Sequence, residues 1–145
     1  MWYLSCTKWE MIDEQVKHYY HIKYATSKDG IDWERNNEIA IDFAYQNEYA
    51  ISVPRVVKEE NGYKMWYSHR GGSKSEYYRI GYAESEDGIK WNRKDDIVNL
   101  DTSEKGWDSK MLCYPFILDY GGDRYLLYNG NDYGKTGFGL AILQK

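Results

Sequence analysis

The sequence has little cysteine, proline or histidine. Its two cysteines, Cys6 and Cys113, give no disulfide framework and no CxxC pair, and two buried free thiols are favoured over a single bridge. Its three histidines show no metal-ligand spacing, so we expect neither a metal site nor a cofactor. No run of about 18 apolar residues occurs, as a membrane span would need, and the first residues do not resemble a signal peptide. We therefore expect a cytoplasmic protein without a membrane partner.

A basic excess is also absent. The chain has 19 Lys and Arg against 23 Asp and Glu, which gives a net charge of −4. Without basic runs it cannot displace counterions from phosphates efficiently, so nucleic acid is not an expected partner. A length of 145 residues, with 42% hydrophobic and 29% charged residues, suits one folded domain over residues 1–145.

Aromatic residues are the most abundant feature of the composition. Tyrosine occurs 16 times and tryptophan 6 times, and aromatics make up 17% of the chain. Aromatic and β-branched side chains favour the pleated, half-buried surfaces of sheets. An all-β protein is therefore the predicted class.

Two stretches of fourteen residues repeat each other. Residues 20–33 read YHIKYATSKDGIDW and residues 78–91 read YRIGYAESEDGIKW, with nine identical positions at an offset of 58. The first, third and fifth residues of each stretch are apolar or aromatic and alternate with other residues, which predicts a strand with one inward face. The Asp-Gly pair predicts a tight turn, in which glycine supplies a positive φ, followed by a return strand.

A second pattern precedes these hairpins. Residues 65–67 (MWY) match residues 1–3 (MWY) and 126–128 (LLY). The only prolines, Pro54 and Pro115, lie 61 residues apart, and each opens a short apolar strand. One full unit thus contains four strands. We place them at Ser52–Lys58, Tyr63–His69, Tyr78–Ser85 and Ile89–Arg93.

Four-stranded antiparallel units at a regular spacing are typical of β-propeller blades. The chain holds about two and a half of them, in pieces 1–43, 48–93 and 107–145. A flat β-sandwich with repeats is the alternative. Because propellers need about four to eight blades to close, a partial propeller leaves unpaired edges and predicts a homodimer. A closed ring and a back-to-back pair both remain open.

The sequence resembles the five-bladed propeller superfamily that includes glycoside hydrolase families 43, 32 and 130. The motifs are YKMWYS at 63–68, YRIGYAES at 78–85, GWDS at 106–109 and YNGNDYGKTGFGLA at 128–141. The resemblance is strongest to the C-terminal half of uncharacterised members found with polysaccharide genes. It implies a carbohydrate-binding or carbohydrate-processing protein. Such relatives carry Arg and Glu where this chain has Val53 and Cys113, and the missing acid argues against hydrolysis.

Glycoside hydrolysis needs two carboxylates, about 5.5 Å or about 6.5–9.5 Å apart. Asp108 and Glu48 are the best catalytic pair in this sequence; otherwise Asp108 caps a turn and Glu48 is a solvated loop charge. Glu84 is expected to pair with Arg79 or a lysine on a blade face instead.

Ligands of propellers sit at one mouth of the central funnel, near the starts of the innermost strands. The following residues are expected to bind substrate there: Arg55, His69, Arg70, Trp107, Tyr114, Asn129, Asn131 and Lys135. Trp107, Tyr114 and Tyr133 would act as aromatic platforms for a sugar ring. Other aromatics recur at blade positions and are expected to pack between blades. They are Trp33, Trp66, Trp91 and Tyr67.

The leading functional hypothesis is recognition or processing of a carbohydrate at this mouth. The alternative is a non-catalytic assembly or protein-interaction module derived from such an enzyme. An acid at position 113 would have favoured the enzyme.

Overall fold

The computed structural model describes residues 1–72 and 75–143 of the chain. Within these residues the chain forms ten β-strands, one 3-10 turn, η1 (Asp95–Ile97), and one four-residue helical segment, α1 (Asn131–Gly134). The predicted all-β class is confirmed. None of the helical segments in the described residues is long and apolar enough to cross a membrane.

The strands fall into three antiparallel groups, which we call the first, second and third blades. The first contains β1 (Trp2–Ile12), β2 (Gln15–Tyr24) and β3 (Ile39–Ile41). The second contains β4 (Glu48–Glu59), β5 (Gly62–Gly71), β6 (Ser75–Ser85) and β7 (Asn92–Arg93). The third contains β8 (Cys113–Tyr120), β9 (Asp123–Asn129) and β10 (Phe138–Leu143).

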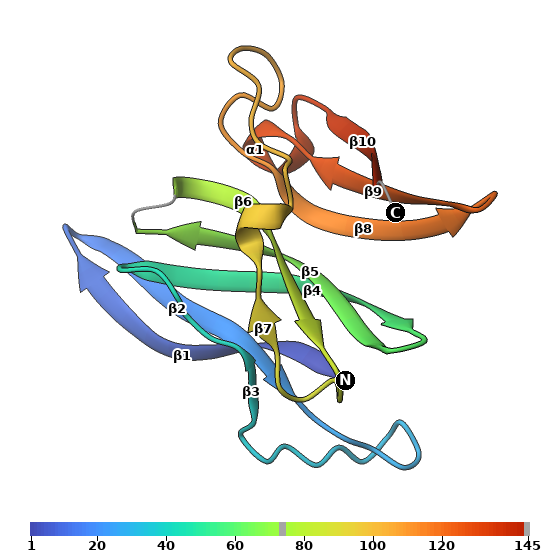
Figure 1. The fold of residues 1–145 in the computed structure, drawn as a ribbon. Helices are drawn as coiled ribbons and strands as arrows, with labels where there is room; N and C mark the ends of the chain where they lie inside the picture. The colour runs from blue at the N-terminus through green and yellow to red at the C-terminus, as the bar shows by residue number, and fades with distance from the viewer. Residues whose placement is uncertain (73–74, 144–145) are drawn as a thin grey trace.

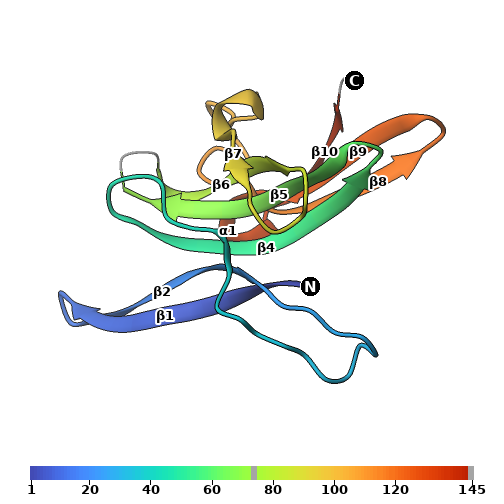
Figure 2. The ribbon, with the colours of Figure 1, turned by 60° about the horizontal axis from the view of Figure 1, so that its bottom comes forward.

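The blades are stacked side by side. Figure 1 shows the third blade on one side of the β4–β6 sheet and the β1–β2 hairpin on the other. The turned view in Figure 2 separates the β1–β2 hairpin from the second blade as a distinct layer. A single parallel bridge between Tyr20 of β2 and Ala50 of β4 joins the first two blades. The two blades therefore approach each other closely at the start of β4. This arrangement is that of a partial propeller.

The return strands are shorter than predicted. After Gly30 there is one isolated bridge, Thr26 to Glu34, and β3 takes the outer place beside β2. In the second blade the expected strand Ile89–Arg93 is reduced to β7. The reason is local: the carboxylates of Asp29 and Asp87 accept the backbone N–H groups of the two residues that follow the glycine. Those N–H groups are therefore not available to a strand ladder.

Each inner strand has a bulge before its proline. Val53 and Tyr114 both have a positive φ, 52° and 58°, and the pairing register shifts at these two positions. Proline donates no hydrogen bond to the ladder, so the strand accommodates it at a bulge that bends the chain. The second and third blades thus share a residue in the left-handed region just before the proline. This conformation is uncommon for a β-branched residue such as Val53.

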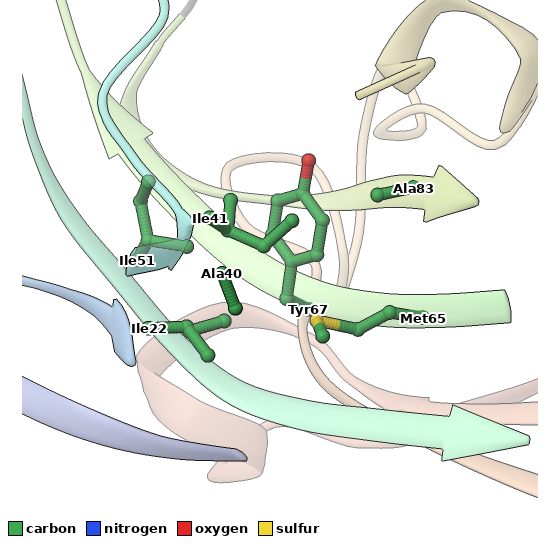
Figure 3. Close-up of a cluster of buried hydrophobic side chains, with 7 residues drawn as sticks. All are labelled: Ile22, Ala40, Ile41, Ile51, Met65, Tyr67 and Ala83. Atoms are coloured by element: carbon green, nitrogen blue, oxygen red, sulfur yellow. The ribbon is translucent and has the colours of Figure 1, made fainter. Parts of the chain in front are cut away.

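The main core lies between the first two blades. Figure 3 shows its buried side chains, which are Ile22, Ala40, Ile41, Ile51, Met65, Tyr67 and Ala83. Tyr67 fits because β6 carries glycine opposite it: a Cβ at Gly81 would lie 2.3 Å from the Tyr67 ring. The third blade repeats this packing, since a Cβ at Gly139 would lie 2.4 Å from the Tyr128 ring. The predicted interblade positions of Trp66 and Tyr67 are confirmed by their burial.

A tryptophan links the first blade to the turn of the second. Trp2 packs against Tyr63 and Trp91, and its Nε1 donates to the Gly88 carbonyl over 2.8 Å. The equivalent turn of the first blade has no such neighbour among the described residues: a Cβ at Gly30 would meet nothing within 4 Å, and Ile31 is 81% exposed.

Apolar residues near the two ends of the chain differ in exposure. Trp2 is half-buried and Leu126 is fully buried between the second and third blades, whereas Phe138 is 74% exposed. One expectation needs correction: Trp33, expected to pack between blades, is 38% exposed, because no blade of the described residues covers the turn that it follows.

Candidate functional site

The start of β4 and the end of β5, which lie side by side, carry two different clusters on alternating residues. Glu48 and His69 contact each other, whereas the next residues in sequence, Tyr49 and Arg70, form a separate contact. Successive side chains of a strand point to opposite faces, so the two clusters occupy the two faces of the same pair of strands.

The first cluster, which we call the carboxylate network, is a set of paired charges. Glu48 is 4% exposed and accepts two hydrogen bonds from Arg93, at 2.8 and 2.9 Å. His69 Nδ1 donates to the same carboxylate over 2.9 Å, and the Ala44 N–H adds a bond of 2.8 Å. Arg93 also donates to Asp95 over 2.7 Å. Every charge in the network therefore has an opposite partner.

Two tyrosines complete this network. Tyr45 and Tyr67 donate their hydroxyls to Asp95, and the Arg93 guanidinium lies 5.0 and 5.4 Å from their ring centroids. Burial alone would raise the pKa of Glu48, but the hydrogen bonds from His69 and Arg93 outweigh it and hold the pKa at about 2. Glu48 thus stays ionised and cannot donate a proton near neutral pH.

The second cluster, which we call the mouth cluster, is aromatic. Its members are Tyr20, Tyr49, Arg70, Tyr78, Tyr114 and Tyr133. It gathers residues from all three blades at the starts of β4 and β8, which is where the sequence predicted a funnel mouth.

The geometry of the mouth cluster is continuous. Tyr20 and Tyr78 meet through their hydroxyls, and the Arg70 guanidinium lies 4.6 Å from the Tyr78 ring and 5.1 Å from the Tyr49 ring. Tyr114 and Tyr133 stack with centroids 5.7 Å apart, and both rings contact Tyr78. Tyr114 and Tyr133 are 36% and 47% exposed, so a ligand can reach them.

Asp108 lies in the third blade, apart from the network that holds Glu48. Asp108 is 5% exposed. The pKa of Tyr128 is raised by the burial of Tyr128 and, to a lesser extent, by the negative charge of Asp108 and a hydrogen bond to Asp108. The two carboxylates predicted as a catalytic pair thus have different surroundings. Glu48 is not the solvated loop charge of the alternative interpretation either.

Trp107 and Asn131 shape the loops of the third blade. Trp107 stacks on Tyr128 at 5.7 Å, and a Cβ at Gly130 would lie 2.5 Å from its ring. Asn131 accepts the backbone N–H groups of residues 110 and 111 and donates to Gly106. The Trp107 ring is used in packing, and the Asn131 amide holds the 106–111 loop. These contacts therefore do not support a role in sugar binding for either side chain.

The other predicted binding residues have different surroundings. Arg55 is exposed and lies 5.5 Å from the Phe116 ring, beyond the bulge of β4. Asn129 donates to the Tyr133 carbonyl and so supports the mouth cluster. Lys135 is exposed at the end of α1. Burial raises the pKa of the Cys113 thiol to about 12, so this group is neither an acid nor a thiolate near neutral pH.

A surface hollow of about 830 Å³ lies at the other end of the second blade, around the β4–β5 turn. Two of its acids are already paired: Glu84 bonds Lys94 and the Tyr82 hydroxyl, and Glu59 bonds Arg124 and Lys64. The prediction that Glu84 pairs with a lysine is confirmed. With these two acids neutralised, this hollow is a weaker candidate than the mouth cluster.

The sequence did not identify Tyr20, Tyr49 and Tyr78 as site residues. A signal for two of them was present, since Tyr20 and Tyr78 open the two repeated stretches at the same position. Equivalent residues of neighbouring blades approach each other near a propeller axis, and their hydroxyls meet here. Arg93 and Asp95, which complete the ion-pair network around Glu48, had no such signal.

Two curated proteins of Mycobacterium tuberculosis are similar in sequence to this chain. "Uncharacterized protein Rv1502" of Mycobacterium tuberculosis strain H37Rv is 40% identical over 144 residues. "Uncharacterized protein MT1551" of strain CDC 1551 is also 40% identical over 144 residues. The match covers 99% of this chain and 46% of each relative, so the chain spans about half the length of the curated relatives that it matches. No protein-family model matches the chain.

Comparison with solved structures is decisive for the fold. A structure titled "Glycoside hydrolase" superposes with a TM-score of 0.74 and 19% identity over 99% of this chain and 40% of that one. Zg3597, a family 117 glycoside hydrolase of Zobellia galactanivorans, gives 0.71 and 21% identity over 87% and 39% of the two chains. The Bombyx mori GH32 β-fructofuranosidase BmSUC1 gives 0.63 and 16% over 97% and 30%. The chain has a glycoside-hydrolase-like fold.

Proposed function

We propose that the protein recognises a carbohydrate at the mouth cluster. The observation that carries this proposal is the exposed, stacked pair Tyr114 and Tyr133. Both rings contact Tyr78, over which Arg70 lies. Aromatic faces suit the C–H faces of a sugar ring, and hydroxyl and guanidinium groups suit its oxygens. The glycoside hydrolases that share the fold support this class of ligand.

Binding is favoured over hydrolysis by this chain alone. Glu48 is neutralised by Arg93, and Cys113 stands where related proteins were expected to carry an acid. The role of Asp108 as a catalytic residue stays a prediction, and it is tested directly by hydrolysis of aryl glycosides. If the native chain hydrolyses these substrates and Asp108→Asn does not, the protein processes a carbohydrate as well as binding it.

The binding test is a titration of the 145-residue chain with a panel of neutral mono- and oligosaccharides, followed by calorimetry and by protein fluorescence. Tyr114→Ala and Tyr133→Ala are expected to weaken binding by at least about tenfold, since each removes half of the stacked platform. Tyr120→Ala is the matched control, because Tyr120 is 75% exposed at the end of β8 and outside the mouth cluster. Equal affinities of all four proteins, or no binding of any sugar, would contradict the proposal.

We also propose that the chain associates as a homodimer. β1 and β10 are the outermost strands of their sheets and leave backbone groups unpaired, and the side chains of Phe138, Leu140 and Ile142 on β10 are 60–74% exposed. The curated relatives have about twice the length of this chain, so a second copy would supply a similar amount of protein to cover these faces. The ten strands of each chain make twenty in a pair, which is the number that five four-stranded blades contain.

Sedimentation at micromolar concentration tests this assembly. A species of twice 17.2 kDa is expected, and Leu140→Ser should shift it toward the monomer, because a polar group would enter the interface. Tyr120→Ser, at the exposed β8–β9 turn, serves as the control. A well-folded monomer of the native chain would refute the dimer.

A further inference from the structure

We propose that the ligand of the mouth cluster carries a carboxylate, as a uronic acid does, and that Arg70 binds this group. The inference rests on the proposed function, because it concerns the same cluster and names the class of sugar that the cluster takes.

The first observation is a comparison among arginines. Four arginines in the described residues are half-buried: Arg70, Arg79, Arg93 and Arg124. Arg79 pairs with Asp101, Arg93 with Glu48 and Asp95, and Arg124 with Glu59 and Asp119. Arg70 forms no ion pair in the described part of the chain. A half-buried guanidinium ordinarily obtains a carboxylate partner, so its absence here marks a position that a ligand can occupy.

The second observation is that Arg70 is held in place without being satisfied. Tyr49 and Tyr78 contact its guanidinium through their rings, and its Nε is buried without a hydrogen-bond partner in the described residues. Arg70 also shares a hydrogen bond with the Tyr20 side chain. The aromatic contacts fix the plane of the guanidinium without occupying the buried Nε donor. A planar carboxylate matches such a donor pair in a bidentate way.

The third observation is the charge around the cluster. The Lys17 Nζ lies 4.1 Å from the ring centroid of Tyr49, which the Arg70 guanidinium also contacts. Two cations therefore flank this tyrosine. The exposed Glu76 raises the pKa of Tyr49 electrostatically but does not pair with Arg70. The cluster is therefore positive around Tyr49, while Tyr114 and Tyr133 offer aromatic faces for the ring of the same ligand.

The experiment compares three methyl glycosides on the 145-residue chain: the β-glucuronide, its methyl ester and the β-glucoside, with the matching galactose series in parallel. At low salt the uronate is expected to bind at least about tenfold more tightly than both neutral compounds, because only it forms charged hydrogen bonds with Arg70. Arg70→Gln should remove this preference, and Arg70→Lys, which keeps the charge but not the fork, should restore part of it. Arg35→Gln, at an exposed arginine in the loop between β2 and β3, should leave it unchanged.

A second measurement does not depend on the variants being well folded. The Nε–H resonance of Arg70 in ¹⁵N NMR spectra of the native chain is expected to shift on addition of the uronate and to stay in place with its methyl ester. If the three glycosides bind alike, or if the resonance does not respond, the carboxylate inference is wrong while carbohydrate recognition stands. If no sugar of either experiment binds, both proposals are wrong.

Discussion

The two faces of the β4–β5 strand pair make opposite use of the same kinds of residue. On one face Arg93 lies between Glu48 and Asp95, and each charge has an opposite charge within 3 Å. On the other face Arg70 lies between tyrosine rings, and no carboxylate of the described residues pairs with it. A satisfied buried network holds strands in place, whereas an unsatisfied guanidinium beside exposed aromatic rings is available to a ligand. A buried charged side chain is therefore a candidate for ligand binding only when no charged residue of the protein already pairs with it.

The strongest way to break this comparison is to remove the cation of the carboxylate network. Arg93→Met leaves Glu48 and Asp95 buried without a counter-charge, which should lower the free energy of unfolding by about 3–5 kcal/mol. Urea unfolding followed by circular dichroism gives the value. Arg79→Met is the control, because its partner Asp101 is exposed and such pairs contribute less than about 1 kcal/mol. A loss below about 1 kcal/mol in Arg93→Met would mean that the network is not structural.

The next prediction concerns acid. The folded-state pKa of Glu48 is about 2, below its ordinary value of 4.5, so its stabilising contribution is present above about pH 4.5 and is lost as the pH falls toward 2. The contribution amounts to about 3 kcal/mol. Denaturation curves between pH 6 and 2 should therefore show a loss of stability that is smaller in Glu48→Gln. Asp95, whose pKa is also lowered by Arg93 against the effect of burial, keeps part of the slope.

The control for this titration is Glu104→Gln, which removes an exposed carboxylate in the loop after η1. Its acid slope should equal that of the native chain. A native curve that is flat between pH 5 and 2 would show that Glu48 is not held by charge in the folded state.

A smaller effect is expected from filling the space beside Tyr67. In Gly81→Ala the added Cβ would lie 2.3 Å from the Tyr67 ring and 2.8 Å from an Asp95 oxygen, so the ring must move and the network with it. The expected cost is about 1–3 kcal/mol in thermal or urea unfolding. Gly121→Ala meets nothing within 4 Å and is expected to cost only about 1 kcal/mol, for its φ of 62°. Equal losses in the two variants would argue against close packing at Gly81.

The smallest effect on stability sharpens the contrast. Arg70→Met removes a half-buried charge that has no carboxylate partner and leaves the tyrosines in contact with an apolar chain of similar length. We expect the free energy of unfolding to change by less than about 1 kcal/mol, while sugar binding is lost. Parallel unfolding and binding measurements decide the point. A destabilisation of more than about 3 kcal/mol would place Arg70 in the same structural class as Arg93.

The sequence predicted the fold well because its repeats are local. The alternation around Tyr20 and Tyr78, the Asp-Gly turns and the two prolines each define a strand or a turn through neighbouring residues. The return strands were overpredicted because the Asp29 and Asp87 carboxylates compete with the ladder, which alternation does not reveal.

The site was predicted less completely, since it depends on contacts between blades. Arg70 was identified from its place after the second strand of a blade and Tyr114 from its place at a strand start, and both belong to the mouth cluster. Whether His69 and Glu48 are free or neutralised depends on Arg93, which lies 45 residues from Glu48 and comes from an outer strand. No local pattern links such residues, so the chemical state of Glu48 needed the three-dimensional structure.

The Trp2 contact with the Gly88 turn makes the stacking of blades directional. The first blade donates the Trp2 indole from β1 to the turn of the second blade, whereas the turn at Gly30 receives no side chain from another blade in the described residues. By the same geometry, a blade stacked against the outer face of the first blade would cover that turn. A symmetric contact between two identical blade faces would leave the Gly30 turn without such a neighbour in both copies. Growth by head-to-tail addition would fill it each time, ending in a ring if the rotation closes and in a filament if it does not.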